Sequence, residues 1–251
     1  ETKVQKIIIE PKKPLGFQDE PYFWQDSKVS GVQTDKGIIK AKKTIVAAGV
    51  WASEILDPIG IDAHSRPQKK YTFVVGADTE SLKALLNTKG LNPENCMPHI
   101  IINCLPHLGV TVMFIPRVRE NSFWITVDVK FMNKFELKDE PRADMKIYEY
   151  GINWILPEYF PPFADAKVKN SWVGQYELNT FDLQPVITQT ANLIMVGAAS
   201  GSGVMKADAI GRIAASLYAD EDYAELYGGS KFKVSDLGIK HRNVEYEEWL
   251  L

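Results

Sequence analysis

The sequence predicts a mixed fold of the α+β or α/β class, in which a first and a last part of similar character enclose a different middle part. Two apolar runs without polar alternation, at 45–50 and 193–197, each enter a turn of small residues. Such runs are typical of strands buried on both faces. Between them, several consecutive strand-forming runs with turn residues indicate a mostly antiparallel sheet.

The elements follow from local periodicity and turn residues. Expected strands lie at 4–9, 29–34, 38–42, 43–52, 70–76, 99–105, 110–116, 122–129, 168–176 and 192–197. Expected helices lie at 81–87, at 142–156 and at 204–220. Pro157 should end the second helix, and the third should place Val204, Ile210, Ile213, Ala214 and Leu217 on one buried stripe. The polar tail from Asp222 onward is expected to pack across the surface.

Composition excludes several classes of function. A chain of 251 residues with 45% apolar residues and a net charge of −3 has no general basic character, so nucleic acid is not expected as a partner. Two cysteines and four scattered histidines predict free thiols, no disulfide scaffold and no metal site. Because no apolar run approaches the length of a membrane span, a soluble cytoplasmic location is the default expectation.

The most informative local unit is the expected strand 192–197, a Gly/Ser loop and the helix that follows it. Its glycines allow close approach of a ligand, and the helix start offers unpaired N–H groups and a positive dipole end. The loop is Ser200-Gly201-Ser202-Gly203, which is neither a Walker A motif nor GxGxxG, because Lys206 stands where the last glycine would be. Taken alone, it is explained equally well as an ordinary tight turn.

Three segments in order resemble the superfamily of FAD-dependent D-amino acid oxidases, sarcosine oxidases and glycine oxidases. They are Glu1-Thr2-Lys3-Val4-Gln5-Lys6-Ile7, then Ile45-Val46-Ala47-Ala48-Gly49-Val50-Trp51-Ala52, then Trp172 through Gly174, Tyr176, Asp182, Pro185 and Asn192 to Gly211. The resemblance implies an incomplete Rossmann-like FAD-binding domain, residues 1–57 and 167–251, interleaved with an antiparallel-sheet substrate domain, residues 58–166. The family's opening strand and GxGxxG loop are not in the sequence. We therefore expect a missing N-terminal FAD-binding segment, or a partner chain that supplies it.

The resemblance also implies site residues. FAD should be bound non-covalently, because the cysteine that tethers flavin in sarcosine oxidases corresponds to Gly174. Cofactor-binding residues are expected to be Val4, Ala48, Gly49, Trp51, Gly174, Ser200, Gly201, Ser202, Gly203, Val204, Met205 and Lys206. Trp51 is equally explained as a core residue.

The family's carboxylate-binding arginines correspond to Tyr176 and Gly201, so no bidentate clamp is visible. Tyr176 and Lys206 are the candidate catalytic residues, with Lys70 or Arg117 as other possible replacements for the clamp. Residues expected on the substrate sheet are Tyr71, Phe73, Asn103, Phe114 and Trp124, of which alternation can place only some over a flavin.

The function implied is oxidation of a small amine or amino acid by hydride transfer to FAD. The form Ser-Gly-Ser-Gly-x-Met-Lys-Ala-Asp of the last loop is similar to dye-linked L-proline dehydrogenases, which favours proline or another secondary amine. One alternative is a non-catalytic or partner-dependent subunit of such a flavoprotein. Another is a tRNA-modifying or assembly-factor relative with the same fold, and the acidic net charge counts against the RNA version.

Overall fold

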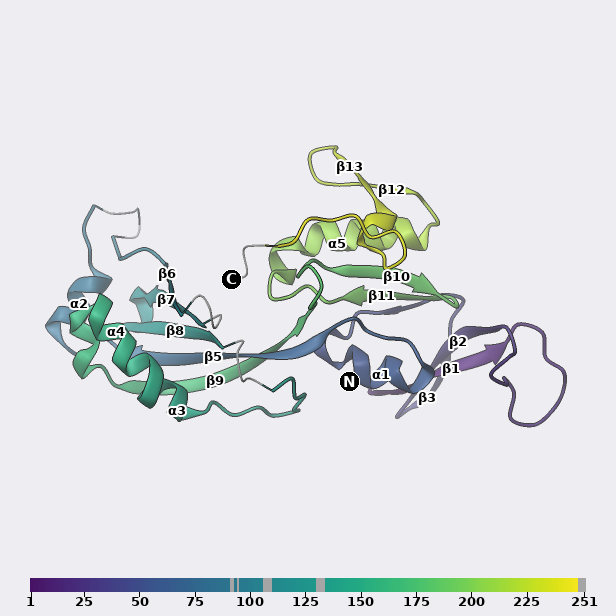
Figure 1. Ribbon diagram of the computed structural model, residues 1–251, viewed down its shortest axis with the longest axis horizontal. Helices are drawn as coiled ribbons and strands as arrows, with labels where there is room; N and C mark the ends of the chain where they lie inside the picture. Colours follow the sequence, from purple (N-terminus) through teal and green to yellow (C-terminus); the bar gives the residue numbers. More distant parts are fainter. Residues whose placement is uncertain (91–92, 94, 106–109, 130–133, 248–251) are drawn as a thin grey trace. The chain divides into compact units, whose positions relative to one another are not determined.

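A computed structural model describes residues 1–90, 93, 95–105, 110–129 and 134–247, and the chain forms two compact units (Figure 1). Unit 1 consists of Glu1–Pro67 and Tyr176–Leu251, and unit 2 consists of Gln68–Gln175. The sequence places these boundaries at 57/58 and 166/167. Strands β5 (Arg66–Gly76) and β9 (Val168–Leu178) belong mostly to unit 2 and continue into unit 1.

Unit 1 begins with an antiparallel sheet of β1 (Val4–Pro11), β2 (Ser27–Thr34) and β3 (Gly37–Lys40), in that order. Gly31 is required where β2 meets β3. A Cβ at this position would lie 2.1 Å from the carbonyl oxygen of Ile39, and its φ of +153° is one that other residues rarely adopt.

The second sheet of unit 1 has the order β10 (Val186–Thr190), β11 (Leu193–Gly197), β4 (Thr44–Val46). β11 pairs antiparallel with β10 and parallel with β4. Helix α5 (Gly203–Tyr218) runs along this sheet, and Ile213 packs in one core with Ile194 (Figure 1). On the other side, Leu193 packs with α1 (Ala52–Leu56). β11 is therefore buried on both faces, as its apolar run predicts.

Two predictions for unit 1 are wrong. Ile45 of β4 is 48% exposed, because β4 is an outer strand of this sheet in the described chain. Val204, predicted on the buried stripe of the helix, is 93% exposed, because it lies in the first turn of α5, before the helix meets the sheet.

The tail forms a hairpin of β12 (Tyr223–Glu225) and β13 (Lys231–Lys233), followed by a 3₁₀ turn at Val234–Leu237. Ala224, Val234 and Leu237 join the core beside α5, so the tail packs on the body of unit 1 as expected.

Unit 2 is a five-stranded sheet with the order β6 (Ile100–Leu105), β7 (Val110–Arg117), β8 (Ser122–Val129), β5, β9. Helices α2 (Glu80–Leu86), α3 (Met145–Ile147) and α4 (Asn153–Tyr159) lie on one face (Figure 1). Residues that alternate toward them, such as Phe73 and Ile125, form the core.

Pro157 does not end the helix that the sequence predicts at 142–156. α3 continues through a π turn at Tyr148–Ile152 into α4, which contains Pro157 and ends at Tyr159. A proline removes a single N–H donor, and the chain still closes the next turn, since the N–H of Phe160 donates to the carbonyl of Leu156 at 2.8 Å.

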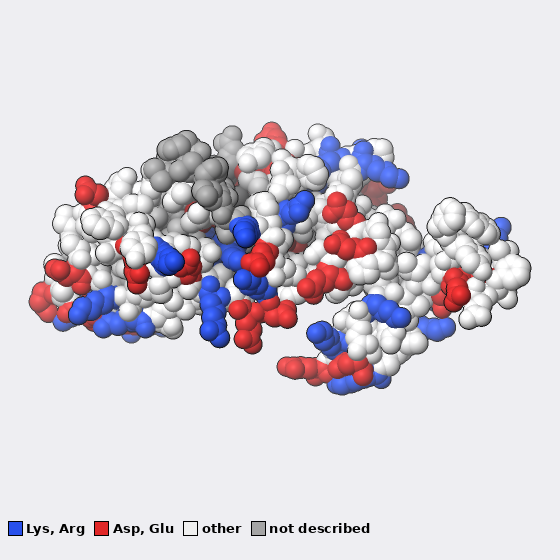
Figure 2. Space-filling model, turned by 60° about the horizontal axis from the view of Figure 1, so that its bottom comes forward, with Lys and Arg blue, Asp and Glu red and all other residues white. Residues whose placement is uncertain are grey.

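Neither cysteine forms a disulfide in the described part of the chain, and Cys96 is buried outside any strand. Among the helices of the described residues, none has both the length and the apolar character needed to cross a bilayer. Acidic and basic side chains are mixed over the face shown in Figure 2.

Candidate functional site

Two segments that are distant in sequence meet at one edge of the second sheet of unit 1. Because β4 and β11 are parallel neighbours, with Val46 opposite Met195, the residues that follow each strand lie at the same edge. Ala48, Gly49 and Trp51 follow β4, and residues 198–202, here named the α5 turn, follow β11. The structure thus brings together the two main segments of the predicted cofactor site.

The backbone of the α5 turn is held in a strained form. Ala198 and Ser200 have φ values of 57° and 52°, which non-glycine residues rarely adopt, and Gly201 has a φ of 91°. The N–H of Ser200 donates to the carbonyl of Glu177 at 2.9 Å. The N–H of Asn179 donates to the Ser200 hydroxyl at 2.9 Å.

Both serine hydroxyls of the turn point inward. Ser200 Oγ donates to the carbonyl of Ala198 and Ser202 Oγ to that of Ala199, and both side chains are buried. Ser202 therefore makes no capping bond with α5. The N–H groups of the first helical turn keep the hydrogen-bonding capacity that a side-chain cap would use, together with the positive end of the helix dipole.

Glu177 is the main residue of this site that sequence reasoning missed. The nearby backbone N–H groups of Ala198 and Ala199 lower the pKa of its carboxyl group, but burial outweighs them and raises this pKa above the ordinary value. Its Oε2 is buried without a hydrogen-bond partner among the described residues. It lies against Gly197, where an added Cβ would be 2.7 Å from that oxygen and would make the carboxylate shift. A carboxylate next to the apolar Leu178 at the end of an expected strand was the available signal.

Tyr176 is the neighbour of Glu177 on β9, so its side chain leaves the strand on the opposite face. Glu177, not Tyr176, is thus directed at the α5 turn. The substrate-binding role of Tyr176 stays a prediction. Gly174 lies in unit 2, where a Cβ would meet open space, and its cofactor role also stays a prediction.

The first turn of α5 exposes apolar side chains. Val204 is 93% and Met205 62% exposed, while Trp51, at the neighbouring segment, is 41% exposed and is not a core residue. Val4, at the start of β1, is 37% exposed. An apolar surface beside uncapped amides suits a flat heteroaromatic ligand.

Lys206 is already engaged. Its Nζ donates to Gln184 Oε1 at 3.0 Å and forms an ion pair with Glu247 from the C-terminal tail. A substrate carboxylate at Lys206 would have to compete with Glu247.

A second ion pair fixes the same tail. Arg242 donates to both carboxylate oxygens of Asp182 and to the carbonyls of Leu237, Gln184 and Pro185. Burial raises the pKa of Asp182, but the bonds from Arg242 and from the N–H of Gln184 outweigh it, so this pKa is lowered overall. Asp182 and Arg242 therefore serve as a structural clamp.

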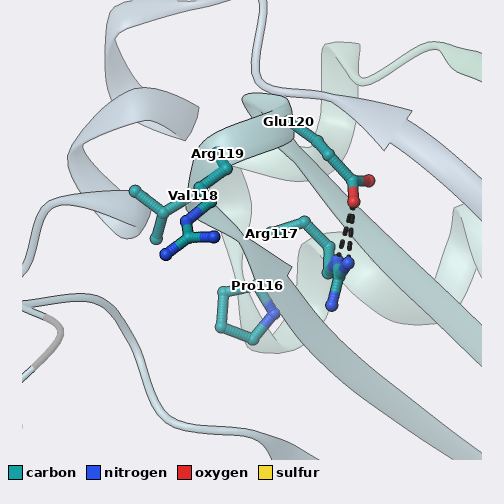
Figure 3. A pocket seen from close by; sticks show the side chains of 5 residues that line it. All are labelled: Pro116, Arg117, Val118, Arg119 and Glu120. Carbon is teal, nitrogen blue, oxygen red and sulfur yellow. Dashed lines mark hydrogen bonds and ion pairs between the residues drawn. The ribbon is translucent and has the colours of Figure 1, made fainter.

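Arg117, another possible clamp for a substrate, is also paired. It lines a cavity of about 440 Å³ in unit 2 with Pro116, Val118, Arg119 and Glu120. Figure 3 shows Arg117 and Glu120 pointing toward one another, and Arg117 Nη2 lies 2.8 Å from Glu120 Oε1. The guanidinium also stacks 4.3 Å over the Trp124 ring.

The residues expected on the substrate sheet divide between its two faces. Tyr71, Phe73 and Phe114 lie in the core under the helices. Asn103 is exposed and Trp124 is half-buried, and both alternate to the face opposite that core.

Comparisons with known proteins show the family of the chain. A family model described as "DAO: FAD dependent oxidoreductase" matches residues 17–217. The chain is 35% identical over 204 residues to FAD-dependent oxidoreductase domain-containing protein 1 of Xenopus laevis, covering 75% of this chain and 37% of that protein. It is 31% identical over 78 residues to glycine oxidase of Pseudomonas aeruginosa, covering 30% of this chain and 21% of that protein.

Among solved structures, L-proline dehydrogenase from P. horikoshii superposes with a TM-score of 0.61 at 18% identity, over 94% of this chain and 52% of that one. The chain therefore spans about half or less of the length of the proteins it resembles.

Proposed function

Because the chain belongs to the family of FAD-dependent oxidoreductases, we propose that the protein oxidises a small amine or amino acid and receives the flavin ring at the α5 turn. The family resemblance found in the sequence is confirmed by the model that matches residues 17–217, and FAD is the cofactor of this family. The expected α+β class is confirmed by the shared fold with the P. horikoshii enzyme.

The observation that carries the proposal is the start of α5. Its backbone amides receive no cap from Ser202, and the exposed Val204 and Met205 flank them. These features fit the electron-rich edge and the apolar surface of a non-covalently held flavin. When bound, FAD would accept the hydride from the carbon beside the substrate nitrogen.

The chain's own residues would position the flavin ring and stabilise the charge that develops on it. The N–H groups of Gly203, Val204 and Met205 would stabilise negative charge at this edge. Val204, Met205 and Trp51 would exclude water, and Glu177 would hold the turn in shape through the bond that its backbone carbonyl accepts from the N–H of Ser200. No acid–base pair is required for this chemistry.

Among substrates, proline or another secondary amine is proposed first. The support is the similarity of the last loop to dye-linked L-proline dehydrogenases, together with the fold shared with the P. horikoshii enzyme. Other amino acids and amines such as sarcosine or D-alanine come next.

The test is anaerobic addition of proline, sarcosine or D-alanine to the flavin-loaded protein, with the visible spectrum as readout. We expect proline to bleach the flavin absorbance fastest. If none of the amines reduces the flavin, the proposed chemistry is wrong.

A second candidate is a non-catalytic or partner-dependent subunit. It is favoured by the pairing of two candidate carboxylate clamps, Lys206 with Glu247 and Arg117 with Glu120. Purification without flavin, even after FAD is added, but with a stably associated protein would favour this candidate. The intact mass and visible spectrum of the native protein would show whether a further segment or chain completes the FAD site.

A further inference from the structure

The loop between β1 and β2, residues 12–26, here named the aromatic loop, exposes large apolar side chains. Leu15, Phe17, Phe23 and Trp24 are 52%, 67%, 102% and 62% exposed. Four such side chains on one short loop are more than scattered surface apolar residues, and they indicate a contact surface. Figure 2 shows this loop, at the right of the view, as a lobe with few charged side chains.

The loop is internally ordered. The Glu20 carboxylate accepts the N–H groups of Leu15 and Phe17, at 3.0 and 2.8 Å, and Gln25 Nε2 at 2.9 Å. At its base, the N–H of Lys12 donates to the carbonyl of Asp26 at 2.8 Å. These backbone groups are satisfied within the loop. The free energy of moving the loop into a less polar medium is therefore lower than for a loop whose backbone groups bond only to water.

Two of the three acidic side chains of the loop have partners within it. Glu20 is held by the backbone N–H groups of Leu15 and Phe17, which lower its pKa. Asp26 pairs with Lys12 at 3.1 Å. Within the loop, Lys12 balances the charge of Asp26, and the charge of Glu20 is directed at the loop's own N–H groups.

A basic concavity lies at the same end of this sheet. It has a volume of about 400 Å³ and is lined by Glu10, Lys28, Val29, Ser30, Lys40, Ala41, Lys42 and Asn192. Lys28 follows the loop by two residues and pairs in register with Glu10. Three lysines against one glutamate, which lies 3.7 Å from Lys40, leave an excess of positive charge.

The concavity also contains a polar group without a partner. Ser30 is 9% exposed, and its hydroxyl has no hydrogen-bond partner among the described residues. A buried hydroxyl without a partner is costly unless a ligand satisfies it. Lysines with a hydroxyl are suited to a phosphate-class anion.

We propose that this end of unit 1 docks on a membrane surface that carries anionic lipids. The rings of the aromatic loop enter the interfacial region, where aromatic side chains are favoured, and Lys28, Lys40 and Lys42 take headgroup phosphates. Apolar rings beside lysines fit a charged bilayer surface better than a neutral protein groove. The rings match the apolar boundary below the headgroups, and the lysines match the anionic headgroups above it.

The test is co-sedimentation of the protein with vesicles of phosphatidylcholine alone or mixed with phosphatidylserine. We expect binding only with phosphatidylserine, and weaker binding at high salt. Lys28→Glu/Lys42→Glu should weaken it at least tenfold, since each lysine contributes roughly fivefold near an anionic surface. Phe17→Ser/Phe23→Ser should weaken it by about tenfold or more.

The matched controls are Lys231→Glu/Lys233→Glu on β13 and Tyr227→Ser on the hairpin turn, all exposed in the same unit. They should bind vesicles like the unaltered protein, and all variants should keep its thermal unfolding midpoint. Equal binding with and without phosphatidylserine, or equal loss in the controls, would overturn the proposal.

Two further outcomes would also overturn it. Inorganic phosphate could raise the unfolding midpoint while vesicles do not bind, which would assign the concavity to a soluble phosphate compound. The loop variants could instead lose a co-purifying protein without any vesicle binding, which would make the aromatic loop a protein interface.

Discussion

At the scale of single residues, Glu177 explains why the α5 turn keeps a strained backbone. The backbone carbonyl of Glu177 accepts the N–H of Ser200, and its carboxylate lies beside the backbone N–H groups of Ala198 and Ala199. The strain at Ser200 is thus compensated by the bonds that its N–H and its hydroxyl make with the backbone of Glu177 and Asn179. This carboxylate occupies the space beside Gly197, where an added Cβ would contact it.

Glu177→Gln should change how stability depends on pH. Burial raises the pKa of Glu177 in the folded protein above its ordinary value of 4.5. Between the unfolded and the folded pKa, the folded protein keeps a proton that the unfolded chain releases, so stability falls as the pH rises through this range. Glutamine keeps one acceptor oxygen and cannot ionise, so this fall should disappear. Thermal unfolding midpoints from pH 4 to pH 8 measure it, and parallel profiles for the two proteins would contradict the role.

At the scale of elements, α5 has two regions with different tasks. Ile213 and Ala214 pack it on the sheet, whereas its first turn presents exposed side chains and backbone donors. The helix therefore anchors the α5 turn at one end without covering it.

Ile213→Ala should lower the free energy of unfolding by about 2–5 kcal/mol, because it leaves a cavity in the core. Val204→Ala should change it by less than about 0.5 kcal/mol, since Val204 is 93% exposed, yet weaken FAD binding up to roughly tenfold. Urea unfolding and a flavin titration measure the two effects. Equal destabilisation by both variants would place Val204 in the core instead.

The existence of most elements could be predicted because strand and helix periodicity are local. The strand predicted at 122–129 has the bounds of β8, and the apolar run at 193–197 is β11. Pro157, Ile45 and Val204 could not be predicted, because their environments depend on which neighbour packs against them.

The candidate site, like the fold, could be predicted only in part. Its two turns have local sequence patterns, but the side chains that shape it come from distant parts of the chain. Glu177 faces Ala198, and Arg242 reaches Asp182 across 60 residues. Nothing near Arg242 in the sequence indicates that partner.

At the scale of the whole molecule, the C-terminal tail is fastened to the body of unit 1 by Arg242 and Glu247. Arg242→Gln leaves the half-buried Asp182 without its main partner and should destabilise the protein by about 2 kcal/mol at neutral pH. Arg212→Gln is the control, because its pair with Asp208 is more exposed and should contribute less than about 0.5 kcal/mol.

The pH dependence of this effect has a fixed sign. Since the pKa of Asp182 is lowered below 3.8 in the folded state, its contribution is present above that value and is lost as pH falls through the folded pKa. Urea unfolding at pH 7 should therefore separate Arg242→Gln from the unaltered protein, and the difference should become smaller as the pH falls through the folded pKa of Asp182. A difference that stays constant as the pH falls would mean that the ion pair is not the cause.

The parallel pairing of β4 with β11 has a consequence for how the chain folds. β4 leaves the ribosome well before its partner, with all of unit 2 between them. β5 and β9, near the two ends of that insertion, are adjacent, and the N–H of Gly76 donates to the carbonyl of Lys167. Once unit 2 is folded, β4 and β11 are joined by a short connection and no longer by a long flexible one. The entropic cost of bringing these two strands together is therefore lower. Nascent chains halted before β11 should hold unit 2 in protease-resistant form while the residues around β4 are still cleaved.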